Sequence, residues 1–378
     1  MIKASPMETG SDTPRHKIRI WDLPTRLIHW LLVLTFTIAM LSQGYDRYLD
    51  IHVYSGYLFL GLLGFRVIWG LIGSNYARFY HFACDWKAVW HYLKTLPTKQ
   101  RQHFLGHNPA GSWAVFLILG LGLIVSLTGL LTLGGEERHG PFAGMIGFAL
   151  GSTIHEWHDA TAWIMLGLIS IHIIGVLVES WLHHENLIKA MITGFKSAPV
   201  SVFAQPISVQ RHGFTATALI LVMIVGMGWY YKPFIGPKLP DNVLWQEACG
   251  ECHLAYHPTL LPARSWQRIL VEQHDHFEED LDLDDETLLE IQTFSIANAA
   301  ESELTEAAWK INHSTPPKQS PLRITKTPYW IEQHKDIAEA IWQHPDVNFQ
   351  GNCGACHLDA EQGTFEDAAM RLPSSSVP

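Results

Sequence analysis

The sequence predicts a mainly α-helical protein with two parts: a bundle of membrane-spanning helices and a small, mostly helical soluble domain after it. Two observations lead to this fold class. Up to about residue 232 the chain contains five apolar runs of about 18 residues or more, the length that an α-helix needs to cross ~30 Å of hydrocarbon. The rest of the 378-residue chain is polar and acidic, and it contains four of the five cysteines.

The five apolar runs set the expected helices of the membrane part. We place them at about residues 27–44, 52–72, 110–133, 157–182 and 213–231. Residues 1–26 are polar and basic, with no apolar core and no small-residue cleavage site, so no removable signal peptide is expected. The first apolar run would then direct the chain to the membrane.

Lys and Arg are distributed unevenly over the connections between these runs. The N-terminal segment and the connections 73–109 and 183–212 together carry 13, whereas the other two connections carry one each, Arg47 and Arg138. Cytoplasmic connections of membrane proteins carry the excess of positive charge. We therefore expect the protein in the bacterial inner membrane, with the N-terminus in the cytoplasm and, after five crossings, the C-terminal domain in the periplasm.

Charge also separates the two parts. Residues 1–236 have 17 Lys and Arg against 12 Asp and Glu, and residues 237–378 have 9 against 24, which gives net charges of +5 and −15. The stretch YKPFIGPKLPDN between them is rich in Pro and Gly, as linkers are. We expect a membrane domain over 1–200, a fifth helix and linker over 201–240, and a soluble domain over 241–378.

Two pentapeptides of the soluble domain, CGECH at 249–253 and CGACH at 353–357, match C-x-x-C-H, the attachment signal for covalent haem c. His253 and His357 would then be the proximal ligands of the two irons. A zinc site would not need a histidine after both cysteine pairs, and no βαβ pattern indicates a thioredoxin-like redox pair. The thiols expected to form the thioethers are Cys249, Cys252, Cys353 and Cys356.

The sixth ligands of these irons are less clear from the sequence. Met370 is the only methionine after the fifth apolar run, so at most one of the two irons could have a His/Met pair. The histidines that could serve as sixth ligands instead of Met370 are His257, His274, His276, His313, His334 and His344.

The fifth cysteine, Cys84, lies in a cytoplasmic connection and is expected to be a free thiol without a role.

Four further histidines, His29, His52, His158 and His172, lie in the apolar runs, where polar side chains are costly and usually functional. His158 and His172 are fourteen residues apart in one run. At ~100° and 1.5 Å per residue, both face the same neighbours at depths that differ by ~21 Å. Successive runs cross the membrane in opposite directions, which sets the depth of each histidine. His29 then lies at the depth of His172 only, and His52 at the depth of His158 only.

Each of these pairs can hold one non-covalent haem b between two neutral imidazoles. Arg66 lies fourteen residues after His52, at about the depth of the inner haem, and could partner a haem propionate; snorkelling to the membrane surface explains Arg66 equally well.

Two other motifs are set aside. HEWH at 155–158 has its histidines three residues apart, so it is not the zinc motif H-E-x-x-H. DLDLDDETLLEI at 280–291 lacks the Gly and the final Glu of an EF-hand loop. We expect Asp284 or Asp285 to cap the helix that follows.

The N-terminal part resembles the prokaryotic cytochrome b561 family, which includes hydrogenase and dehydrogenase b subunits. The resemblance is carried by WDLPTRLIHW, IHVYSGYLFLGLLGFRVIWG, GHNPAGSW, and HDATAWIMLGLISIH followed by HHENLIKAMITG. It implies a four-helix bundle that binds two haems b, with ligands at His29, His52, His158 and His172. The fifth apolar run departs from that family and is expected to tether the soluble domain.

The C-terminal part resembles the dihaem cytochrome c family in CGECHLAYHPTLLPARSW, RITKTPYWIEQH and CGACHLDAEQGTFED. The resemblance implies two bis-histidine haems c, with His276 and His334 as the further ligands. Which of these two histidines serves which haem stays open.

Together these features predict a membrane electron-transfer cytochrome that passes electrons from quinol through two haems b and two haems c to a periplasmic acceptor. Its expected partners are membrane lipid, the quinone pool and a periplasmic redox protein with a basic docking face; no nucleic-acid partner is expected.

His155, Glu156 and Arg138 are candidates for the quinone site, although solvation of a loop would also explain them. The alternatives are a superoxide-oxidising or quinone-reducing enzyme, or the haem-bearing anchor subunit of a larger oxidoreductase. Oligomeric state and haem potentials stay open.

Overall fold

The structure is a computed structural model, and it divides the chain into two compact units. The first consists of residues 1–42, 51–129 and 156–231, and the second of 43–50, 130–155 and 232–378. Arg47, Cys84 and residues 231–236 of the predicted linker lie outside the described residues. The structure describes residues 15–44, 48–82, 85–96, 98, 104–143, 145–199, 210–230 and 237–373.

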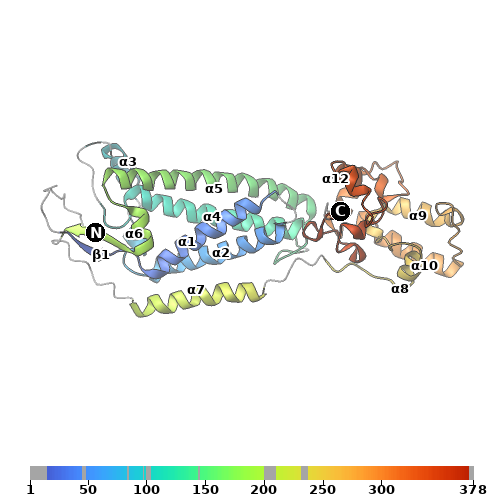
Figure 1. Ribbon diagram of the computed structural model, residues 1–378, viewed down its shortest axis with the longest axis horizontal. Coiled ribbons are helices and arrows are strands. Elements are labelled where there is room, and N and C mark those ends of the chain that lie inside the picture. Colours follow the sequence, from blue (N-terminus) through green and yellow to red (C-terminus); the bar gives the residue numbers. More distant parts are fainter. Residues whose placement is uncertain are drawn as a thin grey trace. The chain divides into compact units, whose positions relative to one another are not determined.

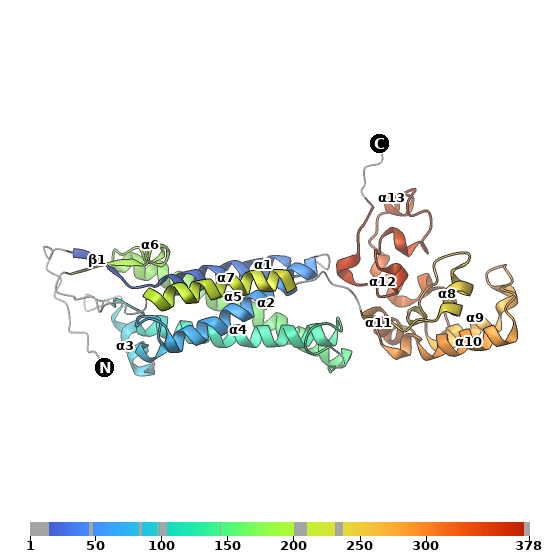
Figure 2. The same cartoon turned by 90° about the horizontal axis from the view of Figure 1, so that it is seen from below.

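Four long apolar helices run alongside one another (Figures 1 and 2). Each is long and apolar enough to cross a membrane, and they confirm four of the five predicted runs. The last of them begins at Phe148 and not at about residue 157 as predicted, because residues 148–156 contain no proline and continue the helix. The four helices are α1 (Leu23–Ser42), α2 (Leu49–Ile72), α4 (Pro109–Gly135) and α5 (Phe148–Leu182).

A shorter apolar helix, α7 (Gln210–Tyr230), corresponds to the fifth predicted run, and its apolar part covers Gly213–Gly226. Ile220 of α7 is fully buried in one cluster with Ile28 of α1 and Leu62 of α2. The helix therefore packs against the long helices of its unit through a continuous apolar contact.

The first unit also contains elements that the sequence did not predict. A two-stranded antiparallel sheet pairs β1 (Arg15–Arg19) with β2 (Phe195–Pro199), with Ile18 opposite Lys196. Two short helices, α3 (Trp86–Thr95) and α6 (Leu187–Thr193), lie in predicted connections. The strands are short and mostly polar, so no local pattern marks them; each is stabilised by a partner far away in the sequence.

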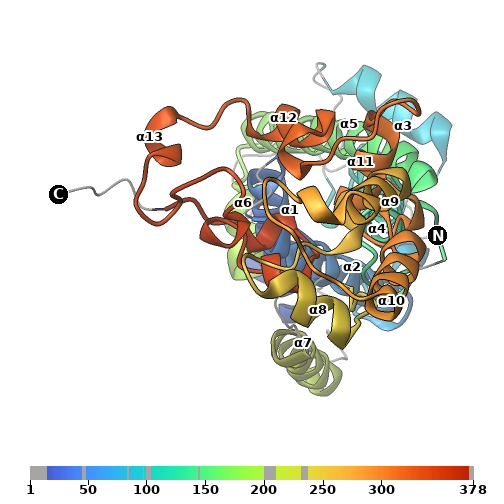
Figure 3. The ribbon, with the colours of Figure 1, turned by 90° about the vertical axis from the view of Figure 1, so that its right-hand side faces the viewer.

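The C-terminal part of the second unit consists of short helices (Figure 3). Thr305 and Thr327 accept hydrogen bonds from the first turns of the helices that follow them, and Asp284, rather than Asp285, caps its helix by accepting from the backbone N–H groups of Glu286 and Thr287. The α-helices are α8 (Val243–Gly250), α9 (Ala263–Val271), α10 (Asp285–Ala297), α11 (Glu306–Ser314), α12 (Pro328–His334) and α13 (Glu339–Trp342).

Small apolar clusters hold these short helices together. Trp245, Leu270 and Ile291 join α8, α9 and α10, and Leu260 packs with Ile311 of α11. The predicted fold class, mainly helical throughout, is confirmed. Single turns of 3-10 helix complete the structure at η2 (Phe79–His81), η3 (Pro258–Leu260), η4 (Gln273–Asp275), η5 (Ala300–Ser302), η6 (Ile324–Lys326), η7 (Cys353–Ala355), η8 (Ala360–Gln362) and η9 (Asp367–Ala369).

Gly363, directly after η8, gives a test of this packing. It has φ +74°, and a Cβ atom there would lie 2.5 Å from the Cβ of the buried His257. We expect Gly363→Ala to destabilise the C-terminal part by more than the ~1–2 kcal/mol that left-handed backbone costs an L-residue. Guanidinium unfolding of the full-length protein measures this cost. The exposed Glu361→Ala in the same turn is the control, and equal midpoints for the two variants would contradict the expected strain.

Candidate functional site

The rings of His52 on α2 and His158 on α5 face each other, with centroids 6.0 Å apart and planes at 83°. The Nδ1 of His52 lies 2.9 Å from the carbonyl oxygen of Ala39, and that of His158 lies 3.0 Å from the carbonyl oxygen of Val125. A carbonyl oxygen can only accept, so in both rings Nδ1 carries the proton. This tautomer leaves the Nε2 lone pair available for a metal ion.

Helix α4 contains no histidine but shapes the place where the His158 ring lies. The hydroxyl of Thr128 is 3.2 Å from the Nδ1 of His158. A Cβ atom at Gly129 would lie 2.9 Å from the Cε1 of the same ring, so a larger residue would push the ring away. The sequence alone did not predict a part for this helix in the site.

The other two membrane histidines, His29 on α1 and His172 on α5, interact electrostatically with each other. The Nδ1 of His29 is buried and has no hydrogen-bond partner within the described part of the chain. This pair therefore differs from His52 and His158, whose rings are held by backbone carbonyls.

Arg66 of α2 is buried, with 7% of its surface exposed. Its guanidinium lies over the ring of Phe79 at 4.8 Å, and its hydrogen bonds to the carbonyl oxygen of Ala77 are long, at 3.4 Å. The side chain therefore does not extend to the protein surface, which removes snorkelling as its explanation, and its N–H donors are weakly used.

His107, in the motif GHNPAGSW, was not singled out from the sequence. Its ring lies 4.8 Å from that of Trp21 and 4.5 Å from that of Phe82. Burial, together with the nearby Arg66, Lys196 and His172, lowers the pKa of His107 to about 3. Its buried Nδ1 has no hydrogen-bond partner among the residues that the structure describes. The motif itself was the signal that could have drawn attention to this neutral imidazole.

In the second unit each C-x-x-C-H histidine faces one other histidine. The ring of His253, after α8, is 6.3 Å from that of His276, and the ring of His357, after η7, is 6.3 Å from that of His334. His276 is presented by a tight turn in which the next two residues have positive φ. His334, at the end of α12, stacks on Trp330, and its Nδ1 lies 2.8 Å from the carbonyl oxygen of Trp330.

These spacings fit two imidazoles on opposite sides of one haem iron. A metal ion lies about 2 Å from an imidazole nitrogen, so two opposed rings have centroids roughly 6 Å apart. Burial lowers the pKa of His276, His334 and His357, which keeps each ring neutral, as a metal ligand must be. The residues of both units therefore fit the groups that the sequence motifs imply.

The remaining histidines of the soluble domain have other contacts. His257 is buried, with Nδ1 2.9 Å from the hydroxyl of Thr259 and Nε2 3.0 Å from the carbonyl oxygen of Pro240, so both ring nitrogens are engaged. The rings of the other three lie near acidic groups or a backbone oxygen and not near a C-x-x-C-H histidine. They are His274 (with Asp280), His313 (with Glu303 and the carbonyl of Trp309) and His344 (with Asp346).

None of the four cysteines of the two motifs forms a disulfide bond. Burial raises the pKa of Cys249 and of Cys353 to about 11, whereas a redox-active pair needs a lowered thiol pKa. Within the described ranges, no group of three or more His, Cys, Asp or Glu residues could hold a metal ion. The raised thiol pKa values argue against the thioredoxin-like alternative.

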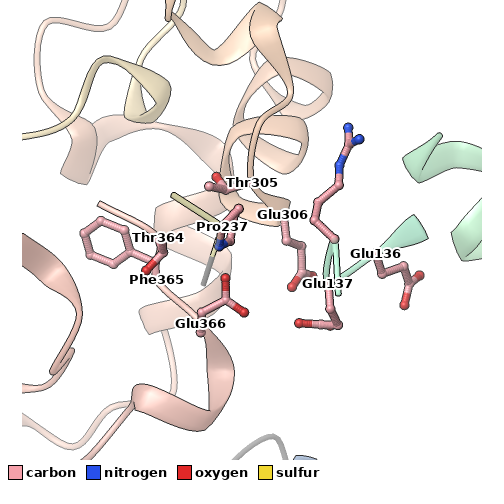
Figure 4. Close-up of a pocket in the computed structure, with 9 residues that line it drawn as sticks. Glu136, Glu137, Pro237, Thr305, Glu306, Thr364, Phe365 and Glu366 are labelled. Atoms are coloured by element: carbon pink, nitrogen blue, oxygen red, sulfur yellow. The ribbon is translucent and has the colours of Figure 1, made fainter. Parts of the chain in front are cut away.

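The three residues named for a quinone site have different surroundings. Arg138 donates to the carbonyl oxygen of Glu303 at 2.9 Å, and the Nδ1 of His155 lies 2.7 Å from Glu136, both within the second unit. Glu156 is exposed and belongs to the first unit. A small acidic pocket lies beside Arg138 (Figure 4) and is lined by Glu136, Glu137, Arg138, Pro237, Thr305, Glu306, Thr364, Phe365 and Glu366.

Comparison with known proteins finds one family for the N-terminal membrane part of the chain and another for the C-terminal domain. Residues 20–194 match the family Prokaryotic cytochrome b561. The N-terminal part is similar to a "Probable Ni/Fe-hydrogenase B-type cytochrome subunit" of Azotobacter chroococcum mcd 1, with 26% identity over 231 residues, 50% of this chain and 94% of the relative. It is also similar to a "Probable Ni/Fe-hydrogenase 1 B-type cytochrome subunit" of Escherichia coli strain K12, with 22% identity over 213 residues, 47% of this chain and 90% of the relative.

Residues 245–365 match the family Dihaem cytochrome c. A solved dihaem cytochrome c from Rhodobacter sphaeroides is 32% identical, covering 34% of this chain and 100% of its own, with a TM-score of 0.31. A second one, from Shewanella baltica OS155, is 26% identical, covering 36% of this chain and 96% of its own, with a TM-score of 0.29. By its two family matches, the chain belongs to the prokaryotic cytochrome b561 family in its N-terminal part and to the dihaem cytochrome c family in its C-terminal part, as a multi-pass membrane cytochrome fused to a soluble one.

Proposed function

We propose that this protein oxidises quinol in the membrane and passes the electrons through two haems b and two haems c to a periplasmic acceptor. The observation that carries the proposal is the repeated pairing of histidine rings at 6.0 to 6.3 Å in both units of one chain. Bound haem supplies a one-electron couple, and the protein supplies its position and surroundings. Four such groups in one chain would connect the membrane with the soluble domain.

In the membrane unit, His52 and His158 would hold one haem b, and His29 and His172 the other. The hydrogen bonds to Ala39 and Val125 support the first assignment, because a second partner at Nδ1 orients the ring and increases the basicity of its other nitrogen. Buried Arg66, with its weakly used donors, would bind a propionate of the haem held by His29 and His172.

In the soluble domain, the ring spacings favour one assignment of the further ligands. His276 would serve the haem at CGECH, opposite His253, and His334 would serve the haem at CGACH, opposite His357. The covalent bonds would come from Cys249 and Cys252 and from Cys353 and Cys356.

Quinol oxidation releases protons together with electrons, so the site needs groups that accept protons. His155 and Glu136 form a hydrogen-bonded pair that can hold one proton, and Arg138 and Glu156 stay candidates to contact the quinone.

We place the N-terminus in the cytoplasm and the C-terminal domain in the periplasm, on the outer side of the inner membrane, with α7 as the fifth crossing. The functional division is 1–200, 201–240 and 241–378.

A second candidate function is that of a haem-bearing subunit in a larger oxidoreductase. The similar proteins named above are called hydrogenase cytochrome subunits, which favours a partner of that kind. Electrons would then come from a catalytic partner and not from quinol. Co-purification of a large catalytic subunit with this chain would identify this function.

Anaerobic addition of a quinol to the purified protein tests the direction of electron flow. We expect the b absorption bands to be reduced first and the c bands afterwards, because electrons would enter in the membrane. Oxidation of reduced protein by a quinone, without reduction by the quinol, would establish the reverse direction and overturn the proposal.

Variants of α5 test the haem b assignment. We expect His158→Ala and His172→Ala to lose different haems b, about half of the non-covalent haem each, since their depths differ by ~21 Å. His52→Ala should then resemble His158→Ala, and His29→Ala should resemble His172→Ala. Pyridine haemochrome assays and redox titrations measure both effects. Identical spectra and the same missing redox step in the two α5 variants would contradict the pairing.

The charge of −15 on residues 237–378 predicts a basic docking face on the acceptor. The second-order rate of electron transfer to it should fall several-fold as the Debye length shrinks from ~30 Å at 0.01 M salt to ~8 Å at 0.15 M. Glu279→Lys with Glu286→Lys should slow association more than the same pair changed to Gln, without altering the haem spectra. If the rate to a physiological acceptor did not depend on salt, the charge would serve solubility alone.

A further inference from the structure

Tyr256 lies three residues after His253, the proximal ligand proposed for the haem at CGECH. Its ring contacts the ring of His253, with centroids 5.1 Å apart and planes at 31°. The Nδ1 of His253 lies 2.8 Å from the carbonyl oxygen of Leu254. Two neighbours in the same loop therefore orient the ring of His253, a backbone carbonyl and an aromatic side chain.

The hydroxyl of Tyr256 reaches the other attachment motif. It donates a hydrogen bond to the carbonyl oxygen of Gly351 at 2.6 Å, since a carbonyl can only accept. Gly351 lies 95 residues after Tyr256 and two residues before Cys353. A Cβ atom at Gly351 would lie 3.1 Å from the hydroxyl oxygen, so glycine leaves room for this contact. One side chain thus contacts a proposed ligand of one haem and the backbone beside the other attachment motif.

One apolar cluster also supports the neighbours of both proximal histidines. Tyr256 and Phe365 are partly buried against it. The ring of Phe365 lies 5.2 Å from the ring of His357, with planes at 64°. The surroundings of His253 and His357 are therefore joined through one core as well as through the hydrogen bond to Gly351. The buried members of the cluster are Leu260, Ala300, Ala307 and Ile311.

We propose that Tyr256 is a positioning residue that couples the two haem c sites. Its ring orients His253, and its hydroxyl holds the CGACH segment at a fixed distance from that histidine. When an electron passes between the two irons, one iron is oxidised and the other is reduced, and no proton moves. The rate of such a transfer depends on the separation of the irons, which this coupling keeps constant. The proposal rests on the haem c ligands proposed above, but not on quinol oxidation or the direction of electron flow.

The simpler explanation is that Tyr256 only fills the core, with its hydroxyl bonded as the hydroxyl of a buried tyrosine usually is. Two variants separate the explanations. Tyr256→Phe keeps the ring and its apolar contacts and removes only the bond to Gly351. Tyr256→Leu removes the aromatic contact with His253 as well. A residue that only fills the core would not change the orientation or the separation of the haem sites in either variant.

Electron paramagnetic resonance of the oxidised full-length protein with its haems tests the role of the ring. The signal of a ferric haem with two imidazole ligands depends on the angle between the ring planes. This angle is 30° for His253 with His276 and 55° for His334 with His357. We expect Tyr256→Leu to shift the signal of the CGECH haem and to leave that of the CGACH haem in place. Tyr256→Phe should shift neither.

Pulsed dipolar measurements on the same samples test the role of the hydroxyl. We expect the distribution of distances between the two c irons to be broader in Tyr256→Phe than in the wild type, because the CGACH segment loses its bond to the loop of His253. The haems b contribute the same mutual distance in every variant, so a change reports the c sites. The matched control is Phe349→Leu, which removes an exposed aromatic side chain beside Gly351 and should keep the distribution of the wild type.

An unchanged distance distribution in Tyr256→Phe would overturn the coupling, and an unshifted CGECH signal in Tyr256→Leu would overturn the role of the ring. If Tyr256→Leu failed to assemble with its haems, Tyr256→Phe would still decide the coupling. The proposed function fails differently. A pyridine haemochrome assay that found no covalent haem in the wild type would contradict the proposed ligands, whatever the two Tyr256 variants show.

Discussion

The hydrogen bond between an imidazole Nδ1 and a backbone carbonyl is the interaction on which the candidate sites of this cytochrome depend. It holds His52 and His158 in the membrane unit and His334 in the soluble domain, and the Nδ1 of His253 lies 2.8 Å from the carbonyl oxygen of Leu254. In each case the bond selects the tautomer and directs the other nitrogen outward. In the pair of His52 and His158 both rings are set in this way, and in each pair of the soluble domain one ring is. A ring held like this can face another ring at the spacing that one metal ion requires.

The two units provide these carbonyls by different means. In the membrane unit they belong to long helices, α1 and α4, whose oxygens accept a second hydrogen bond, and Gly129 leaves the space that the ring of His158 occupies. In the soluble domain the carbonyls are close in the sequence to the rings they hold: Trp330 lies one turn before His334 in α12, and Leu254 follows His253. A tight turn presents His276. Rigid parallel helices and small, well-capped loops thus produce nearly the same ring spacing, because the requirement comes from the bound group and not from the fold.

Buried ionisable groups mark the places where the fold departs from the usual pairing of charges. Arg66 makes only long hydrogen bonds, and His107 is held neutral by its buried surroundings next to that arginine. Groups of this kind reduce stability unless something binds to them, and such sites are therefore expected where a protein binds an anion or a quinone.

Local patterns in the sequence determined much of this protein. Apolar length identified the four long helices, the C-x-x-C-H spacing identified the two attachment motifs, and the fourteen-residue interval in α5 placed His158 and His172 on one face, because all three depend on residues close together in the chain. Tertiary structure decided the rest. It paired β1 with β2, brought His276 to His253 and His334 to His357, gave α4 its part beside His158, and gathered Glu137, Glu306 and Glu366 around one pocket. These contacts join segments that are distant in the sequence, and neither periodicity nor composition records which distant segments will meet.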